Sequence, residues 1–358
     1  MPHPSATALD LSASSVELTQ ALCDIESVSG HETAIADAVE AALSNAAHLE
    51  LFREGDAIVA RTNLGRERRV VIAGHIDTVP INNNLPSEIR GDELWGRGTV
   101  DMKGGVAVQL KLAAELASPI VDITWIWYDN EEVSSELNGL GRLARVRSDL
   151  LEGDFAILGE PTAGNIEGGC NGTLRVDVRT SGKRAHAARP WMGHNAIHDL
   201  APILGILAEY QPAELEVDGL DYRESLNAVL IGGGVATNVI PDEATVHVNY
   251  RFAPSRTGAE AIEHLRELFA GHELTVVDLA EGARPGLDAP LAQEFVAAVG
   301  GVPLPKYGWT DVARFSALGI PAVNYGPGDP LLAHADDERV PVAQITACEN
   351  ALRSWLNG

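Results

Sequence analysis

Two histidines and five acidic residues in this sequence belong to the types that bind divalent metal ions and activate water. They occur in separate segments of the chain, as His75, Asp77, Asp101, Glu131, Glu132, Glu160 and His334. If these segments converge, like-charge repulsion among the carboxylates would not be tolerated without bound cations. Imidazole and carboxylate ligands without thiolate favour zinc, with cobalt or manganese as substitutes. These residue types therefore predict a centre with two divalent cations.

Local spacing predicts different roles for neighbouring acidic residues. In His75-Ile76-Asp77 the first and third side chains lie on the same side of an extended segment, so Asp77 can accept the second ring N–H of His75 and orient the imidazole. Adjacent Glu131 and Glu132 cannot easily serve one metal in the same way. We therefore assign Glu132 to the metal and Glu131 to the general base that takes a proton from the attacking water.

Short apolar strands precede most of these residues. Strands are predicted over residues 70–74, 123–128 and 155–159, and candidate ligands follow each of them. In open α/β sheets, ligands bind at the carboxyl ends of strands, so loops far apart in the sequence can form one crevice. Asp101 lies in a glycine-rich loop, which lets the backbone approach a site closely before a helix begins. A single His-x-Asp or Glu-Glu pair is usually part of a surface loop, so the shared position after strands is the stronger signal.

The order of predicted elements indicates two domains. Strands that alternate with helices predict an α/β catalytic domain with a mostly parallel sheet and helices on both faces. From about Thr173 the strands alternate polar and apolar residues, which favours an antiparallel sheet with one wet face. We interpret residues 173–284 as an α+β domain inserted into the catalytic domain, which would comprise residues 1–172 and 285–358.

Composition and missing motifs argue against several classes of protein. Acidic residues outnumber basic ones, 51 to 26, and the formal net charge of −25 opposes binding to nucleic acid or to an anionic membrane. The three cysteines show no C-x-x-C spacing, and no signal peptide or membrane span is evident, so a cytoplasmic protein is expected. The absence of G-x-S-x-G and of a P-loop sets aside α/β-hydrolase esterases and P-loop nucleotide binding.

The motifs, taken in order, resemble those of a known family: the zinc-dependent amidohydrolases and exopeptidases that include aminoacylase, acetylornithine deacetylase and succinyl-diaminopimelate desuccinylase. The resemblance covers nearly the whole chain. It rests on the segments Gly74-His75-Ile76-Asp77-Thr78-Val79-Pro80, Gly96-Arg97-Gly98-Thr99-Val100-Asp101-Met102-Lys103-Gly104-Gly105, Asn130-Glu131-Glu132, Gly159-Glu160-Pro161-Thr162 and His334-Ala335-Asp336-Asp337-Glu338.

The resemblance implies two Zn²⁺ ions per subunit and a division of the ligands between them. Asp101 would bridge the two ions. His75 and Glu160 would complete one site, whereas Glu132 and His334 would complete the other.

The resemblance also implies a role for the inserted domain, as a lid that joins two subunits in a homodimer. In the family this domain carries a histidine that reaches the active site of the partner subunit, and His186 matches it. Without the family, His186 would be interpreted as a surface histidine in a loop. Glu131 matches the general base of the family, in agreement with the role assigned above.

For the substrate, the family implies a small N-acylated amino acid. Asn238 and Arg251 match positions that hold the substrate, and Arg251 can bind a carboxylate through two N–H groups, although without the family it is an ordinary strand arginine. Arg184 is one of several basic side chains able to counter an anionic acyl group. Thr310 lies in a segment similar to one of the desuccinylases but offset by one residue, which leaves its role open.

Within the family, the resemblance is closest to enzymes that hydrolyse N-succinyl-LL-2,6-diaminopimelate to succinate and LL-2,6-diaminopimelate in lysine and diaminopimelate synthesis. Deacetylation of acetylornithine is the second expectation, and a dipeptidase or carboxypeptidase is the third. A protein of another class, a non-catalytic homologue that binds an acylated amino acid, is disfavoured because Glu131 and a full set of candidate ligands are present.

Overall fold

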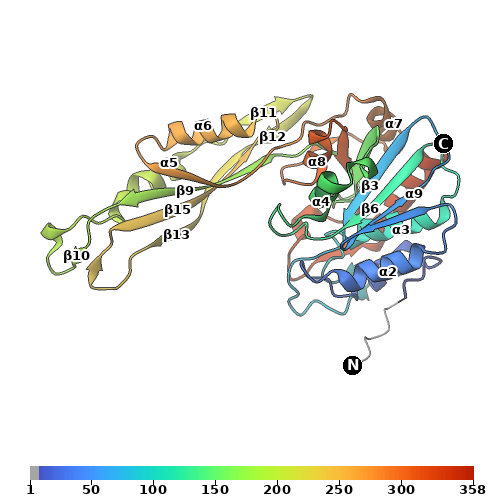
Figure 1. Ribbon diagram of the computed structural model, residues 1–358, viewed down its shortest axis with the longest axis horizontal. Coiled ribbons are helices and arrows are strands. Elements are labelled where there is room, and N and C mark those ends of the chain that lie inside the picture. Colours follow the sequence, from blue (N-terminus) through green and yellow to red (C-terminus); the bar gives the residue numbers. More distant parts are fainter. Residues whose placement is uncertain (1–7) are drawn as a thin grey trace. The chain divides into compact units, whose positions relative to one another are not determined.

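The computed structural model describes residues 8–358, which form two compact units (Figure 1). The first unit contains the described residues up to Gly168 together with Gly286–Leu304 and Arg314–Gly358. The second contains Gly169–Pro285 and Pro305–Ala313.

The segment 305–313 is grouped differently from the sequence-based prediction, which assigned it to the catalytic domain. Its contacts explain the difference. The backbone N–H of Asn171 donates to the Lys306 carbonyl at 3.2 Å, and the Trp309 indole N–H donates to the Glu281 carbonyl at 3.0 Å. These hydrogen bonds tie the segment to the second unit.

The first unit is built on an eight-stranded sheet whose centre is parallel. The strand order is β1 (Glu50–Glu54), β2 (Ala57–Arg61), β6 (Asp122–Tyr128), β3 (Arg69–His75), β7 (Phe155–Leu158), β18 (Ala322–Asn324), β8 (Glu167–Gly168) and β17 (Leu304–Pro305). β3 pairs in parallel with β6 and β7, and β7 pairs in parallel with β18. Antiparallel pairing occurs towards the ends, between β1 and β2, β2 and β6, and β18 and β8. The predicted mostly parallel sheet is confirmed.

Helices cover this sheet because its strands are apolar on both sides. Val70 and Ile72 of β3 join a core that also contains Leu18, Val106 and Ile345 from three helices. Alternate strand residues point to opposite faces, so Val71 and Ala73 turn to the other side. The helices of this unit are α1 (Ser15–Cys23), α2 (Thr33–Leu43), α3 (Lys103–Glu115), α4 (Gly139–Val146), α7 (Pro290–Val299) and α9 (Val342–Asn357), and α8 (Val312–Ala317) crosses the boundary between the units.

A small antiparallel sheet links two loops that matter for the site. It contains β19 (Arg339–Pro341), β5 (Glu93–Trp95) and β4 (Glu88–Arg90). β19 pairs antiparallel with β5. The start of the loop that follows β5 therefore lies beside the end of the loop that precedes β19. Asp101 lies in the loop that follows β5, and His334 lies in the loop that precedes β19.

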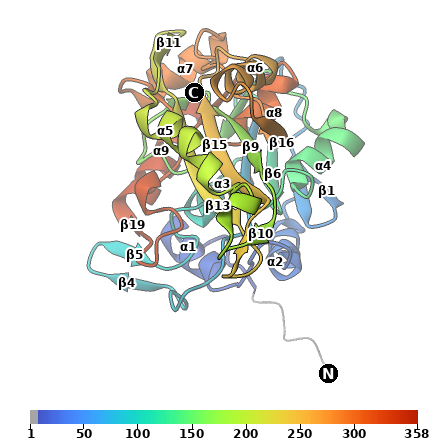
Figure 2. The same ribbon diagram turned by 90° about the vertical axis from the view of Figure 1, so that its left-hand side faces the viewer.

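The second unit is a four-stranded antiparallel sheet with helices on one face. Its order is β13 (Ser225–Gly233), β15 (Glu243–Phe252), β9 (Gly172–Ser181) and β16 (Glu273–Ala280). Buried Val176 and Val248 pack with Ile203 of α5 (Ala201–Glu209) and Leu265 of α6 (Gly258–Leu268). Figure 2 shows α5 lying across this sheet. The predicted antiparallel sheet with one wet face is confirmed.

Two short strand pairs complete the second unit: β10 (Ala185–His186) with β14 (Val239–Ile240), and β11 (Glu214–Val217) with β12 (Leu220–Arg223). In the described part of the chain, no helix is both long enough and apolar enough to cross a membrane.

Candidate metal centre

The predicted ligands of the first unit gather where parallel strands end. His75 is the last residue of β3, Glu131 and Glu132 follow β6, and Glu160 follows β7. Asp101 precedes α3, and His334 follows the short 3₁₀ helix η4 (Pro330–Leu332). The side chains therefore converge because neighbouring parallel strands place their carboxyl ends at one edge of the sheet.

Three groups of these side chains have ligand atoms within 4.8 Å of one another. The groups are His75 with Asp101 and Glu160, Asp101 with Glu132 and His334, and His75 with Glu131 and Glu132. All the predicted metal ligands are thus brought together, and the predicted base lies beside them.

Asp101 belongs to two of the groups and directs one oxygen towards each. Its Oδ1 lies 3.0 Å from Nε2 of His75, and its Oδ2 lies 3.2 Å from Nε2 of His334. Nε2 of His334 is also 2.9 Å from Oε1 of Glu132. Asp101 is thus shared by two of the groups, with one carboxylate oxygen facing each histidine.

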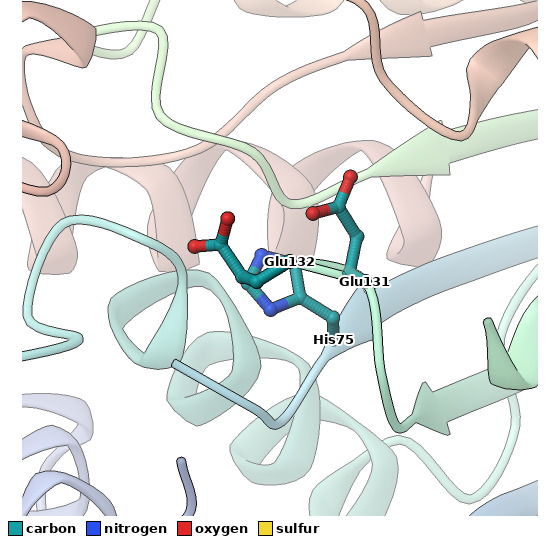
Figure 3. Close-up of side chains that lie close together, drawn as sticks. All are labelled: His75, Glu131 and Glu132. Atoms are coloured by element: carbon teal, nitrogen blue, oxygen red, sulfur yellow. The ribbon is translucent and has the colours of Figure 1, made fainter. Parts of the chain in front are cut away.

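Glu131 and Glu132 extend from adjacent positions to different surroundings. Figure 3 shows their carboxylates on either side of the His75 imidazole in that view. Glu132 also belongs to the group formed with Asp101 and His334, whereas Glu131 is grouped only with His75 and Glu132. This difference fits the separate roles predicted for the two glutamates.

The acidic and imidazole side chains stabilise each other's charged forms. Burial opposes protonation of His75, but its contacts with Asp101 and Asp77 outweigh that effect and hold its pKa well above the ordinary value. Hydrogen bonds with Asp101 and Glu132 raise the pKa of His334 to about 10. Burial opposes ionisation of Asp101, but the two histidines outweigh it and lower its pKa. Positive charge is therefore favoured among these carboxylates, and this donor set suits divalent cations.

Asp77 holds the backbone that carries both glutamates. Its Oδ1 accepts the N–H of Glu131 at 3.0 Å, and its Oδ2 accepts the N–H of Glu132 at 3.1 Å and the hydroxyl of Ser29 at 2.7 Å. Nδ1 of His75 is 3.1 Å from the backbone carbonyl of Asp77 and 3.4 Å from its Oδ1. The residue Asp77 thus supports the His75 ring mainly through its carbonyl.

Glu338 is a structural partner of the site to which the sequence analysis gave no role. Its Oε1 accepts the N–H groups of Val100 at 2.9 Å and Asp101 at 3.2 Å, and its Oε2 is 2.8 Å from a guanidinium nitrogen of Arg97. The same nitrogen of Arg97 donates to the carbonyl of Ala335 at 3.2 Å. Glu338 and Arg97 are both buried, so this ion pair joins the Asp101 loop to the His334 loop. The only signal in the sequence was that Glu338 ends the motif His334-Ala335-Asp336-Asp337-Glu338.

The remaining predicted residues, His186, Asn238, Arg184, Arg251 and Thr310, belong to the second unit. Two of them lie close together: the N–H of Ala187, next to His186, donates to the Asn238 carbonyl at 2.9 Å. His186 is exposed, and its Nδ1 accepts the N–H of Ala188 at 3.0 Å. Arg184 forms an ion pair with Asp242 at 2.8 Å, so part of its guanidinium is already engaged.

Arg251 and Thr310 occupy different positions in that unit. Arg251 lies on β15, paired with Thr173 of β9 and Ser225 of β13, and is partly buried on the wet face. Burial and the nearby Arg175 lower its pKa. Thr310 is buried, and its carbonyl lies 3.7 Å from the Cys170 thiol.

The fold and the side-chain groups together define an α/β protein whose sheet edge carries a candidate two-metal hydrolytic centre. A model of the family described as "Peptidase family M20/M25/M40" matches residues 71–358. The chain belongs to this family, which confirms the resemblance inferred from its motifs. It is accordingly a hydrolytic enzyme.

Relatives of known name match over nearly the full length. A Mycobacterium tuberculosis protein named "Putative succinyl-diaminopimelate desuccinylase" is 55% identical, over 98% of this chain and 100% of the relative. A succinyl-diaminopimelate desuccinylase of Corynebacterium glutamicum is 49% identical, over 98% of each chain.

Solved structures share the fold at lower identity. A tripeptidase of Staphylococcus aureus has a TM-score of 0.79 and 20% identity, covering 98% of each chain. A Bacillus subtilis protein described as a dinuclear metal-binding peptidase from the M20 family has a TM-score of 0.71 and 16% identity, covering 96% of each chain. These likenesses support the fold alone.

Proposed function

We propose that this enzyme hydrolyses N-succinyl-LL-2,6-diaminopimelate to succinate and LL-2,6-diaminopimelate. The observation that carries the proposal is the full-length similarity to proteins named for this activity, at 55% and 49% identity. The candidate centre supports it because the expected metal ligands and the expected base Glu131 lie close together in the first unit. The reaction would supply a step of lysine and diaminopimelate synthesis.

The proposed cofactor is a pair of Zn²⁺ ions, with Co²⁺ or Mn²⁺ as substitutes. His75, Asp101 and Glu160 would hold one ion, and Asp101, Glu132 and His334 the other. When bound, such ions lower the pKa of water and polarise a carbonyl group. The absence of thiolate from the ligand set favours zinc of the catalytic type over a structural cysteine site.

Glu131 is the proposed general base. Asp77 accepts the backbone N–H of Glu131 at 3.0 Å and so fixes the start of its side chain. The Glu131 carboxylate would take the proton of the attacking water and return it to the leaving amine as the amide bond breaks. The base must be a carboxylate that does not bind metal. The neighbouring Glu132 cannot take this role while it serves as a ligand.

His186 is proposed to stabilise the oxyanion that develops at the attacked carbonyl, in the active site of a partner subunit. Because its Nδ1 accepts the Ala188 N–H, the neutral imidazole carries its proton on Nε2, where it can donate a hydrogen bond. His186 is the exposed residue of β10, and an exposed histidine is able to reach another chain.

The homodimer that this role requires is proposed to form through the second unit. β13 ends the four-stranded sheet, and all its residues from Asn227 to Gly233 are exposed. Its apolar Val229, Leu230 and Ile231 are 55%, 67% and 59% exposed. An apolar edge strand of this kind favours pairing with another chain.

Arg251 is the proposed binding site for a carboxylate of the substrate, with Asn238, Arg184 and Thr310 as further contacts. The Arg251 side chain is partly buried on the wet face of β15, where burial and the nearby Arg175 lower its pKa. A partly buried guanidinium is suited to binding a carboxylate through two N–H groups, here the free carboxylate of the succinyl group. Arg184 would contribute only the N–H groups that Asp242 leaves available.

We also propose a cytoplasmic location. The three cysteines are free and buried, in keeping with a reducing compartment, and the substrate is an intermediate of amino-acid synthesis.

A side-by-side assay tests the proposed reaction. The purified, zinc-loaded protein would be incubated with succinyl-diaminopimelate, acetylornithine and a set of dipeptides, and the released amine would be measured. We expect kcat/KM for succinyl-diaminopimelate to exceed the other values by about 100-fold or more. A preference for acetylornithine or for a dipeptide would reassign the substrate. Hydrolysis of none of them would favour the non-catalytic binding protein.

A further inference from the structure

The turn that carries Glu131 is held by three consecutive backbone N–H groups. Those of Glu131 and Glu132 donate to Asp77, as described above. The N–H of the preceding residue, Asn130, donates at 3.1 Å to Oε1 of Glu32, a residue far away in the sequence. Asn130 has a φ of 58°, in the left-handed region, so the turn takes a conformation that its surroundings must maintain.

Glu32 directs its side chain away from its own helix. It occupies the N-cap position of α2 but makes no side-chain cap hydrogen bond there. Instead, its Oε1 accepts the N–H of Gly30 at 2.9 Å as well as that of Asn130. Glu32 is 1% exposed, so the carboxylate is committed to these contacts inside the first unit. Burial, with the nearby charge of Asp77, raises its pKa.

Glu32 and Asp77 act on different parts of the same turn. Asp77 fixes the N–H groups of the two glutamates, and Ser29 holds Asp77 in turn at 2.7 Å. Glu32 fixes the N–H of Asn130, the residue before the two glutamates. The segment from Ser29 to Glu32 therefore supports both points at which the turn is attached.

We propose that Glu32 is a positioning residue for the general base, setting the direction of the Glu131 side chain through the Asn130 N–H. The proposal rests on the role of Glu131 in the proposed function. Glu32 itself touches neither the ligand groups nor the reacting atoms. Its contribution is the hydrogen-bond acceptor, which predicts that glutamine can replace it and alanine cannot.

Kinetics of Glu32→Ala, Glu32→Gln and the control Glu26→Ala test this proposal. Glu26 is an exposed acidic residue that precedes the segment from Ser29 to Glu32. In Glu32→Ala we expect kcat to fall roughly 10- to 100-fold, because loss of a supporting hydrogen bond displaces the base, with KM changed by less than about threefold. Zinc content should be unchanged. Glu32→Gln and Glu26→Ala should keep most of the wild-type kcat.

A kcat of folded Glu32→Ala within about threefold of the wild type would overturn the proposal. So would an equal loss in Glu32→Gln, which would show that the acceptor is not what matters. If Glu32→Ala does not fold, Glu32→Asp replaces it, because the shorter side chain withdraws the acceptor while keeping the charge, and the same fall in kcat is expected.

Hydrogen exchange separates this proposal from the proposed function. Amide exchange at residues 130–132 should be at least about tenfold faster in Glu32→Ala than in the wild type, with exchange in the preceding strand β6 unchanged. Unchanged exchange at the turn would contradict the positioning role. If the wild-type protein hydrolyses no acylated amino acid, the proposed function fails, whereas this measurement still decides the role of Glu32.

Discussion

At the scale of single residues, the candidate centre depends on a division of roles between adjacent glutamates. Glu132 shares a group with Asp101 and His334, whereas Glu131 lies beside His75 outside that group. Both backbone N–H groups are fixed by Asp77, so the two side chains start from defined positions. Replacing only one of the two glutamates can therefore distinguish the role of the base from that of the metal ligand.

Replacing Glu131 by glutamine should remove turnover but not metal. We expect kcat to fall about 10²- to 10⁴-fold, because the amide cannot accept the proton of water. The zinc content, measured on the same preparation, should equal that of the wild type. Glu136→Gln, which alters an exposed glutamate that follows the turn, is the matched control and should keep wild-type activity. Activity retained in Glu131→Gln would exclude this residue as the base.

Glu338→Ala should weaken both the fold and the Asp101 loop. The substitution leaves the buried Arg97 guanidinium without its carboxylate partner, which costs about 3–5 kcal/mol in the free energy of unfolding when a buried ion pair is broken. Chemical denaturation of the zinc-free proteins measures the difference. The control is Asp336→Ala, at an exposed position of the same loop, which should change stability by less than about 0.5 kcal/mol. Equal stability of the two variants would show that the ion pair contributes nothing.

At the scale of elements, local signals in the sequence were sufficient for many helices and strands. The apolar spacing over residues 15–26 predicts a helix, and α1 begins there at Ser15, capped by Ser14 in a capping box with Glu17, but ends at Cys23. The apolar spacing over residues 258–268 also predicts a helix, and α6 covers these residues, helped by a second capping box at Thr257. The sequence predicts a further helix over residues 195–209, but the α-helix α5 begins only at Ala201. A 3₁₀ turn (His198–Leu200) precedes it, and Pro202 lies in its first turn.

The candidate site was predictable where strand ends dictate it and not where distant contacts do. His75 ends one apolar strand, and Glu132 and Glu160 follow two others, so their convergence follows from parallel pairing. Glu32 and Glu338 carry no such signal, since their acceptor roles depend on loops that are far away in the sequence. The same limit explains the segment 305–313, whose attachment to the second unit rests on hydrogen bonds with residues 171 and 281.

The exposed edge of β13 leads to a prediction about assembly. Leu230→Asp should convert the proposed dimer into a monomer, because a charge placed in an apolar strand edge opposes pairing with another chain. Light scattering coupled to size-exclusion chromatography measures the mass. Val277→Asp on β16, at the opposite edge of the sheet, is the control: Val277 is 60% exposed, close to the 67% of Leu230. A monomeric wild-type protein would contradict the proposed interface.

At the scale of the whole molecule, the net charge of the chain and the charges of the candidate site have different explanations. The net charge of −25 is consistent with a solvated acidic surface, whereas the site itself combines carboxylates with imidazoles inside the first unit. The three cysteines are also removed from solvent, in positions spread over both units. None of them belongs to the ligand groups found among the described residues.

The thiols should be unreactive in the native protein. Burial raises the pKa of Cys23 and Cys348 to about 12 and that of Cys170 to about 11, from an ordinary value of 9.0. Because folding raises these pKa values, the folded protein holds the thiol protons more tightly than the unfolded chain does. The stability of the folded state that results is fully present below pH 9 and is lost as the pH rises through 11 to 12. Alkylation with iodoacetamide at pH 8 should therefore be slow in the native protein and fast in denaturant. Rapid alkylation of the folded protein at pH 8 would refute the burial of these side chains.

The central claim is that Asp101 joins two metal groups that are both needed for hydrolysis. The most direct test is a zinc titration of chelator-treated protein, with bound zinc and succinyl-diaminopimelate hydrolysis measured on the same samples. We expect two zinc ions per chain in the wild type, no turnover in the metal-free protein and full turnover only as the second ion binds. Asp101→Ala should lose at least one ion together with the activity. Full turnover in the metal-free protein, or two zinc ions retained by Asp101→Ala, would contradict the claim.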